Sequence, residues 1–247
     1  MSFSNLEYSV RDGVALIRLA KPGDRSNALG TSFLQELHSA TELARDSGNV
    51  HLLLFTGKDR TFSAGADLAE MEGFTPGEVL DFLHAGQSLV RLIIGLDIIT
   101  VAAVNGLALG GGLELALACD IRWAHAKAVF GLPEASLGLI PGWGGIPLLK
   151  RVMTASASVE LLAGGGYLSA RKAFETGLVS RLFDGADFED QVLAEARTTA
   201  AGGGDLLQGI KERLKREKGG IDLAAGDRTF LKLWNERQKA AKPAKTA

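Results

Sequence analysis

Two glutamates carry the strongest chemical signal in this sequence. Glu114 follows three consecutive glycines, and the residues three and four positions away from it along a helix are all small or apolar. Glu134 lies between Phe-Gly-Leu-Pro and another small, apolar stretch, and it too has no adjacent cation. Such surroundings raise the pKa of a carboxyl group, which makes it a usable general acid or base near neutral pH. The alternative is that the two side chains are solvated and unrelated, but their shared context beside glycine-rich loops favours one site.

Two turns of small residues offer a second chemical feature. One contains Ala66 and the other Gly111, and each follows an apolar stretch and precedes a helical one. The first N–H groups of a helix have no partner within it, and the positive end of the helix dipole lies behind them. If the strands before the two turns are neighbours in one sheet, the amides of Ala66 and Gly111 converge on one oxygen and form an oxyanion hole. Two ordinary tight turns are the alternative.

Other chemistries find less support. A nucleophile elbow, G-x-S-x-G, is absent because Ser63 and Ser136 each lack the preceding glycine. The sequence contains no Walker motif and no G-x-G-x-x-G, and its four histidines lack the spacing of metal ligands. Cys119, the only cysteine, is expected to be a packing residue. Trp143 interrupts a small-residue loop, where it either shapes a pocket or packs into the core.

The elements that must position these residues alternate between strand and helix. Segment 51–56 is almost wholly apolar, as is typical of a strand in a sheet covered on both faces. Strand, small-residue turn and helix recur after residues 51, 98 and 121, so we expect a core of similar units. Strands are predicted at 14–19, 51–56, 98–104, 120–124, 128–131 and 179–183, and helices at 28–45, 78–96, 146–153, 170–176, 188–200, 205–218 and 227–240. A short helical piece is also predicted after Leu68, and an Ala/Leu helix after the three glycines, up to about Ala118.

Composition narrows the class of protein. The 247 residues are 46% hydrophobic and 23% charged, with a formal net charge of −2, which is ordinary for a globular protein. This charge argues against nucleic acid or an anionic membrane as a partner. The N-terminus lacks the features of a signal peptide, and no apolar run approaches the roughly 20 residues that span a bilayer. With one cysteine and no disulfide, we expect a cytoplasmic protein.

Several sequence blocks together resemble the crotonase, or enoyl-CoA hydratase/isomerase, family. The likeness covers roughly residues 10–185, and the joint occurrence of the blocks in the family's order is highly specific. The blocks are SNAL at 26–29, FSAGADL at 62–68, VNGLALGGGLEL at 104–115, FGLPE at 130–134 and LGLIPGWGG at 137–145. The resemblance implies an α/β fold with a crotonase-like ββα spiral core at residues 1–186 that carries an acyl-CoA site. A C-terminal helical trimerisation segment would follow at residues 187–247.

The same resemblance implies partners and residue roles. The substrate would be an acyl-CoA, with no metal and no cofactor beyond the coenzyme A of the thioester, and the assembly a homotrimer or a dimer of trimers. Ala66 and Gly111 match the family's oxyanion-hole donors, and Glu114 and Glu134 match the two glutamates that hydratases use. Gly142 matches the small residue beside the water and the acyl carbons. The residues expected to contact substrate are Arg25, Ala28, Ala64, Gly65, Asp67, Leu68, Gly110, Pro133, Gly142 and Trp143.

The implied activity is the addition of water to a 2-enoyl-CoA, giving a 3-hydroxyacyl-CoA in fatty acid metabolism. Retention of both glutamates favours hydration over double-bond isomerisation, which usually needs one. An isomerase, decarboxylase or hydrolase acting on another acyl-CoA is an alternative within the fold. A non-catalytic acyl-CoA-binding member, in which Trp143 fills the pocket, is an alternative of another class.

Departures from the family pattern affect these expectations, among them Ile146-Pro147 in place of the usual polar pair. Ala69 stands where many members place a lysine after Ala-Asp-Leu, so a phosphate contact would have to come from Arg25, Lys58 or Arg60. Trp143 replaces a smaller residue and is expected to narrow or reshape the acyl pocket.

Overall fold

Residues 2–216 are described by the computed structural model, and their strands form two sheets. Within these residues the larger sheet has six strands in the order β1-β2-β3-β5-β7-β10, and the smaller has four in the order β4-β6-β8-β9. Neighbouring strands run parallel except in the pairs β1–β2 and β8–β9. The strands are β1 (Leu6–Arg11), β2 (Val14–Leu19), β3 (Leu52–Gly57), β4 (Thr61–Ser63), β5 (Ile99–Val104), β6 (Leu107–Leu109), β7 (Ile121–His125), β8 (Val129–Gly131), β9 (Tyr167–Ser169) and β10 (Arg181–Phe183).

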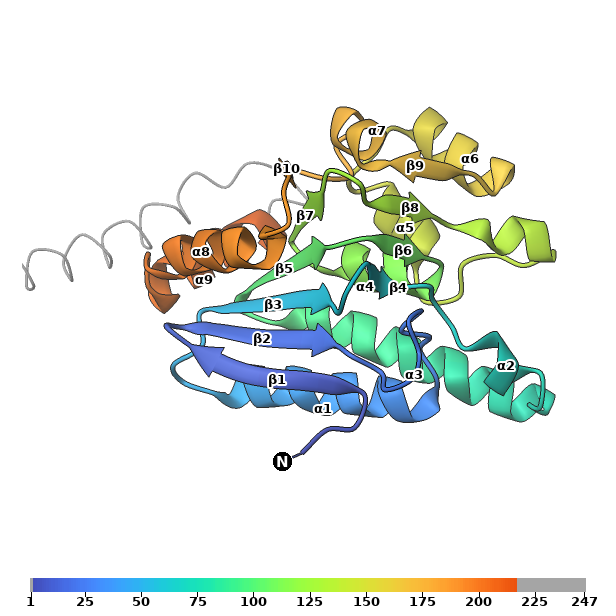
Figure 1. Ribbon diagram of the computed structural model, residues 1–247, viewed down its shortest axis with the longest axis horizontal. Helices are drawn as coiled ribbons and strands as arrows, with labels where there is room; N and C mark the ends of the chain where they lie inside the picture. The colour runs from blue at the N-terminus through green and yellow to red at the C-terminus, as the bar shows by residue number, and fades with distance from the viewer. Residues whose placement is uncertain (1, 217–247) are drawn as a thin grey trace, which may run out of the picture.

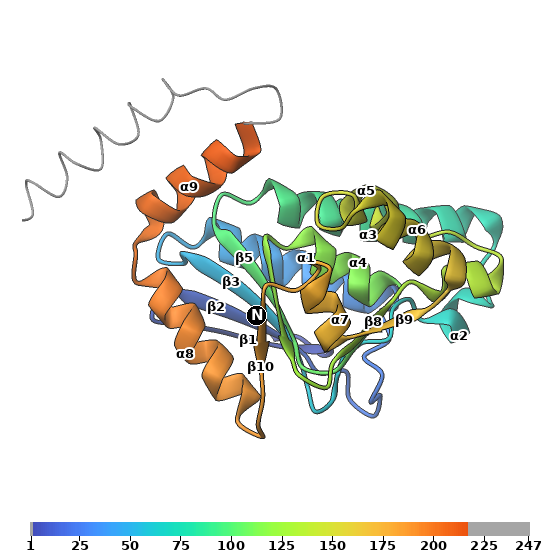
Figure 2. The ribbon, with the colours of Figure 1, turned by 90° about the horizontal axis from the view of Figure 1, so that it is seen from above.

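Helices cover both faces of the larger sheet. Helices α1 and α3 lie on one face and α8 on the other (Figure 1; Figure 2). Along β2 the buried side chains alternate, so that Ile17 packs on the α1 side and Leu16 on the α8 side. The helices are α1 (Thr31–Asp46), α2 (Leu68–Met71), α3 (Pro76–Gly95), α4 (Gly111–Ala118), the 3₁₀ helix η1 (Pro133–Leu137), α5 (Gly145–Leu149), α6 (Ala155–Gly164), α7 (Ala170–Glu175), α8 (Phe188–Ala200) and α9 (Gly204–Arg216).

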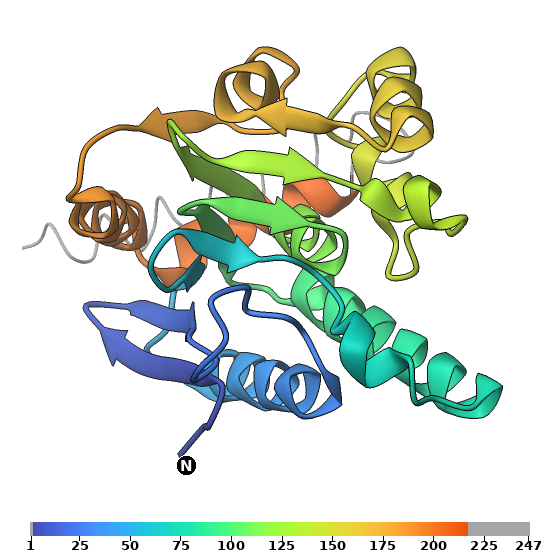
Figure 3. The same ribbon diagram turned by 45° about the vertical axis from the view of Figure 1, so that its right-hand side comes forward.

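The core repeats one structural unit. The chain passes from a strand of the larger sheet to a strand of the smaller sheet and then to a helix, as in β3-β4-α2, β5-β6-α4 and β7-β8-η1. In Figure 3 the strands of these units lie one above another in chain order, from cyan through green to yellow-green. This arrangement agrees with the spiral core that the sequence predicts.

Local sequence explains why several elements begin where they do. Thr75 and Glu78 form a capping box at the start of α3, with proline in its first turn. Ser169 accepts a hydrogen bond from the amide of Lys172 and caps α7, as predicted. Strand β3 is buried along its whole length, which agrees with its almost wholly apolar sequence.

Some predicted boundaries were wrong. Helix α1 begins at Thr31 rather than 28, because Leu29 instead forms a β-bridge with Ala66. Helix α5 ends at Leu149 rather than 153. The sequence analysis also missed β1, α6, β9 and the short strands β4 and β6, which are too brief to show a periodic pattern.

The C-terminal segment begins with a helix that packs on its own chain. Phe188, Val192 and Ala196 of α8 lie in the same buried cluster as residues of the larger sheet. The predicted helix at 227–240 lies outside the described residues. Within residues 2–216, none of the helices combines the length and the apolar character needed to cross a membrane.

Candidate active site

The two small-residue turns meet because the strands before them are neighbours. Strands β4 and β6 pair in parallel, so the turns that follow them open at the same end of the smaller sheet. Gly65 has a φ of 98°, and a Cβ atom there would lie 3.1 Å from the amide nitrogen of Gly111 and 2.7 Å from the carbonyl oxygen of Leu109. Glycine is therefore required at residue 65 both for its backbone conformation and for the close approach of the two turns.

Within residues 2–216, the amides of Ala66 and Gly111 are not used to hold the fold together. Leu29 donates to the carbonyl of Gly65 (2.8 Å) and accepts from the amide of Asp67 (3.1 Å), and in such a parallel bridge the Ala66 amide points away. Gly111 is the first residue of α4, where the helix supplies no acceptor. Neither amide donates a hydrogen bond to any residue in the described range 2–216. Two free donors thus lie at one end of the small sheet, beside the positive end of the α4 dipole.

Glu114 is buried in the first turn of α4. Its side chain is only 2% exposed, and its Oε1 accepts hydrogen bonds from the amides of Trp143 (2.8 Å) and Gly145 (2.7 Å). Burial raises the pKa of Glu114 to about 7; the amide hydrogen bonds oppose the increase, and the nearby charge of Glu134 adds to it. The carboxyl group can therefore exchange a proton near neutral pH.

Glu134 approaches the same end of α4 from the 3₁₀ helix η1. Its Oε1 lies 3.2 Å from where a Cβ atom on Gly110 would be. Its Oε2 is buried and has no hydrogen-bond partner among residues 2–216, and burial raises the pKa of this glutamate above its usual value. A buried, unpartnered carboxylate oxygen is costly, so its presence points to a ligand or a water as its partner.

Trp143 packs between α3 and α4 and is 4% exposed. Its indole ring contacts Phe82, with ring centroids 5.6 Å apart, and lies against the backbones of Gly86 and Gly111. The ring is thus a core residue, as one of the two sequence-based interpretations has it, and its role in shaping a pocket stays a prediction. The adjacent loop is tied to α3 by Gln87, whose side chain donates to the carbonyl of Gly142 (2.9 Å).

The residues predicted to contact substrate divide into two groups. The first group adjoins the glutamates or the free amides and consists of Gly65, Gly110, Pro133, Gly142 and Trp143. The second group lies toward the loop after β2 and consists of Arg25, Ala28, Ala64, Asp67 and Leu68. In the second group the Asp67 carboxylate is engaged within the fold. It caps α2 by accepting from the amide of Glu70 and forms an ion pair with Lys21 at 2.9 Å. The exposed Arg25 lines a cavity of about 290 Å³ together with Lys21 and Lys58.

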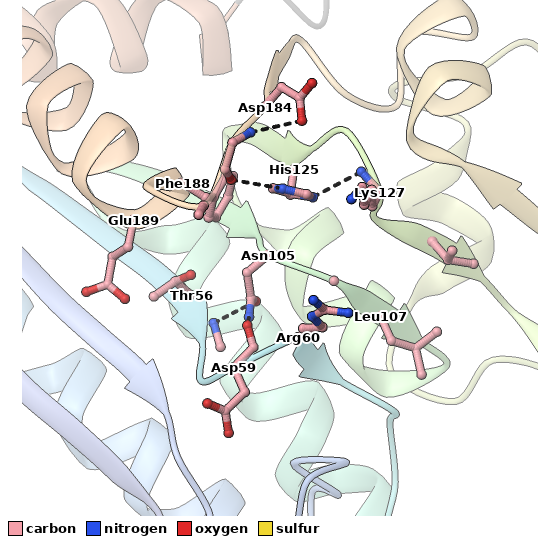
Figure 4. A pocket seen from close by; sticks show the side chains of 15 residues that line it. Thr56, Asp59, Arg60, Asn105, Leu107, His125, Lys127, Asp184, Phe188 and Glu189 are labelled. Atoms are coloured by element: carbon pink, nitrogen blue, oxygen red, sulfur yellow. Dashed lines mark hydrogen bonds between the residues drawn. The ribbon is translucent and has the colours of Figure 1, made fainter.

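A cavity of about 740 Å³ lies at the other end of the smaller sheet and is not the glutamate site. Its lining includes Arg60, Asn105 and Lys127 from the turns that join the two sheets and His125 from the end of β7 (Figure 4). Neither Glu114 nor Glu134 borders it. Elsewhere in residues 2–216, no group of three or more His, Cys, Asp or Glu side chains is arranged to hold a metal ion.

Sequence reasoning missed the groups that hold the site together. Asn27, in a left-handed conformation, donates to the carbonyl oxygens of Leu19, Thr61 and Phe62 and so fixes the loop before Ala66. Gly86 was also missed, although a glycine inside an otherwise apolar helical pattern is a signal of close packing.

The spiral of ββα units places two amides without an acceptor beside two carboxyl groups without a neighbouring cation. This arrangement is typical of a class of enzyme that carries out acid–base chemistry on a carbonyl compound. The chain belongs to the enoyl-CoA hydratase/isomerase family, whose sequence model matches residues 9–240.

Individual relatives agree with this assignment. The chain is 38% identical to the crotonyl-CoA hydratase of Syntrophomonas wolfei over 183 residues, which is 74% of this chain and 70% of the relative. It is 37% identical to a probable enoyl-CoA hydratase of Bacillus subtilis over 79% of this chain and 74% of the relative. The crystal structure of an enoyl-CoA hydratase from Bacillus anthracis superposes with a TM-score of 0.85 at 30% identity, covering 94% of this chain and 90% of that chain. The predicted family, fold class and enzymatic nature are thereby confirmed, whereas the roles of individual residues stay predictions.

Proposed function

We propose that the chain adds water across the 2,3 double bond of a 2-enoyl-CoA and that Glu114 and Glu134 transfer the protons. One observation carries this proposal above all. Two carboxyl groups without a neighbouring cation approach the N-terminus of α4, where the amides of Ala66 and Gly111 have no acceptor among the described residues. Hydration needs both features, because it creates negative charge on the thioester oxygen and moves two protons.

The amides would act on the thioester carbonyl. When water attacks C3, electron density moves through the double bond onto the carbonyl oxygen and gives an enolate. The Ala66 and Gly111 N–H groups would stabilise that oxygen, and loss of one such donor typically costs about 10²–10³ in rate. The α4 dipole adds to the effect because Gly111 is the first residue of the helix.

The glutamates would divide the proton transfers. Glu114, held by the amides of Trp143 and Gly145, would accept a proton from the attacking water. Glu134, whose pKa burial raises above its usual value, would deliver a proton to C2 as the enolate collapses. Return of the proton from Glu114 to Glu134 would restore the starting state, so that each turnover consumes one water.

The coenzyme A portion would extend from the Ala66 turn toward the loop after β2. Lys21 is tied to the turn by its ion pair with Asp67, and Arg25 and Lys58 lie beside it around the smaller cavity. These cations would take the place of the family lysine that Ala69 replaces. A homotrimer or dimer of trimers and a place in fatty acid metabolism, which the family resemblance implies, and a cytoplasmic location, which the composition indicates, stay predictions.

Turnover of crotonyl-CoA by the purified chain tests the proposal. Hydration removes the enoyl thioester chromophore, so we expect absorbance to fall with wild type and the rate to drop by about 10²–10⁴ in Glu134→Gln. Glu160→Gln is the matched control, because Glu160 is exposed on α6, and it should keep the wild-type rate.

The other outcomes assign other functions. Binding of crotonyl-CoA without turnover, for wild type and across enoyl chain lengths, would identify a non-catalytic acyl-CoA-binding protein. Turnover that persists in Glu134→Gln would refute the proposed proton donor. Isomerisation, decarboxylation or thioester hydrolysis without hydration would place the chain among the other activities of the fold.

A further inference from the structure

The indole of Trp143 fills a space that two glycines leave open. A Cβ atom on Gly86 of α3 would lie 2.2 Å from the indole Cε2 and Nε1, and one on Gly111 of α4 would lie 2.3 Å from Cζ3. Real Cβ atoms essentially never approach another atom closer than 3.0 Å. Each helix therefore needs glycine where it meets the ring, and the ring fits this site only because both residues are glycine.

A glycine at residue 86 lowers the stability of helix α3. It lies in the interior of the 20-residue α3, where glycine is about 1 kcal/mol less favourable than alanine. The neighbouring buried residues of the helix are large and apolar, including Phe82 and Leu89. The indole ring supplies the physical reason for glycine at this position, since any side chain there would displace the ring.

The ring lies next to the groups proposed to act on the substrate. Its six-membered portion contacts Gly111, whose amide is one of the two free donors, and the backbone amide of Trp143 donates to Glu114 Oε1. The C2 and C3 atoms of an enoyl thioester bound to that amide must lie near the glutamates. An acyl chain that continued from C3 toward α3 would meet the indole.

Further aromatic rings close the space behind the indole. Phe82 packs on Trp143, and Phe74 packs on Phe82 with ring centroids 5.9 Å apart. Leu83, also on α3, contacts the backbone of Gly142, where a Cβ atom would lie 2.5 Å from its Cδ2. The side of the site that faces α3 is thus packed with protein.

Building on the proposed hydratase function, we propose that Trp143 is a specificity-determining residue that restricts the enzyme to short 2-enoyl-CoA substrates such as crotonyl-CoA. The indole closes the acyl-chain side of the site, while Gly86 and Gly111 provide the room that the indole needs. Longer chains are excluded by steric overlap with a buried ring that is held between two helices.

Chain-length profiles of Trp143 variants test this proposal. We would measure kcat/KM for crotonyl-CoA, 2-hexenoyl-CoA, 2-octenoyl-CoA and 2-decenoyl-CoA with wild type, Trp143→Phe and Trp143→Ala. In wild type each added pair of methylenes should lower kcat/KM by about tenfold or more. Trp143→Ala should raise the octenoyl-to-crotonyl ratio by about 100-fold, and Trp143→Phe, which withdraws the ring from Gly111, should mainly admit the hexenoyl chain.

A matched control variant distinguishes a change in the shape of the acyl pocket from a general loss of core packing as the cause of altered chain-length ratios. Trp123 is also 4% exposed, but it packs on the α8 side of the larger sheet. Trp123→Phe removes the same atoms at equal burial, so it should leave the chain-length ratios unchanged. If Trp143→Ala does not fold, Trp143→Phe alone decides, because it keeps most of the buried ring.

Binding distinguishes failure of this proposal from failure of the proposed chemistry. Calorimetric titration with butyryl-CoA and octanoyl-CoA, which cannot be hydrated, should show butyryl-CoA preferred by wild type and the preference lost in Trp143→Ala, whatever the turnover. Equal wild-type affinities and equal kcat/KM from crotonyl-CoA to 2-decenoyl-CoA would overturn the proposal. Ratios that Trp143→Phe and Trp143→Ala leave unchanged would overturn it as well.

Discussion

Acidic side chains lie at both ends of helix α4, but the two ends treat them differently. Just beyond the C-terminal end, the Asp120 carboxylate accepts from the amide and hydroxyl of Thr100 (2.8 Å each) and pairs with the buried ammonium group of Lys211 at 2.6 Å. At the N-terminal end, Glu114 accepts only from neutral amides, and Glu134 has a buried oxygen without a partner among residues 2–216. At the C-terminal end a cation neutralises the carboxylate, whereas among residues 2–216 no cation pairs with Glu114 or Glu134.

The presence or absence of a neighbouring cation distinguishes the structural carboxylate of Asp120 from the carboxyl groups of Glu114 and Glu134, which are proposed to be functional. The ion pair between the buried Lys211 and the more exposed Asp120 joins distant segments, α9 and the end of α4, and so serves the fold. A buried carboxyl group without a cation instead has a raised pKa, which for Glu114 reaches about 7. Such a group destabilises the fold when it ionises and is ready for proton transfer, a combination typical of catalytic sites.

The largest expected effect concerns activity. Glu114→Gln should lower kcat for crotonyl-CoA hydration by about 10²–10⁴, because glutamine still accepts from the amides of Trp143 and Gly145 but cannot take a proton. Asp120→Asn should leave kcat per folded molecule unchanged. Steady-state kinetics on both variants, corrected for folded fraction by circular dichroism, makes the comparison. Equal losses in the two variants would contradict the distinction between the ends of α4.

Stability should show the opposite pattern. Asp120→Asn removes the carboxylate charge that pairs with the buried ammonium group of Lys211, so we expect it to lower the free energy of unfolding by about 1.5–3 kcal/mol at neutral pH. Urea denaturation measures the change. In the double variant Asp120→Asn/Lys211→Met much of the loss should be recovered, and a double variant as unstable as Asp120→Asn alone would rule out the ion pair as the cause.

Glu114→Gln should stabilise the fold in a pH-dependent way. The folded-state pKa of Glu114 is raised from 4.5 to about 7, so its contribution to stability is fully present below pH 4.5 and is lost as pH rises through 7. Glutamine does not undergo this loss. The variant should therefore gain on wild type between those pH values, by at most roughly 3 kcal/mol at 1.36 kcal/mol per pKa unit. Urea denaturation at pH 5 and pH 8 tests the sign, and a variant less stable than wild type at pH 8 would contradict it.

The smallest expected effect is the pH dependence of the wild-type rate. If Glu114 must be ionised to accept a proton from water, kcat/KM should fall about tenfold per pH unit below the Glu114 pKa of about 7. Asp120→Asn should retain this limb because its charge is not used. Initial rates from pH 5 to pH 8 provide the profile, and a flat profile would refute Glu114 as the base.

Much of the fold follows from local sequence patterns. Helix α8 matches its predicted range, and β2, β3, β5 and β7 agree with theirs within one or two residues. The reason is that a long apolar or periodic segment predicts its own secondary structure. The three-residue strands β4 and β6 carry no such pattern. Yet they determine the site, because their pairing brings the Ala66 and Gly111 turns together.

The sequence by itself determined which groups are available for chemistry: two glutamates in apolar surroundings, two glycine-rich turns and a set of blocks that identify the family. Only the tertiary structure decided how these groups are held. It brought the amides of Trp143 and Gly145 to Glu114, inserted the indole between Gly86 and Gly111, and paired Asp120 with Lys211. The physical reason is that propensity and periodicity describe each residue and its chain neighbours, whereas these contacts join segments far apart in the chain and depend on how whole elements pack.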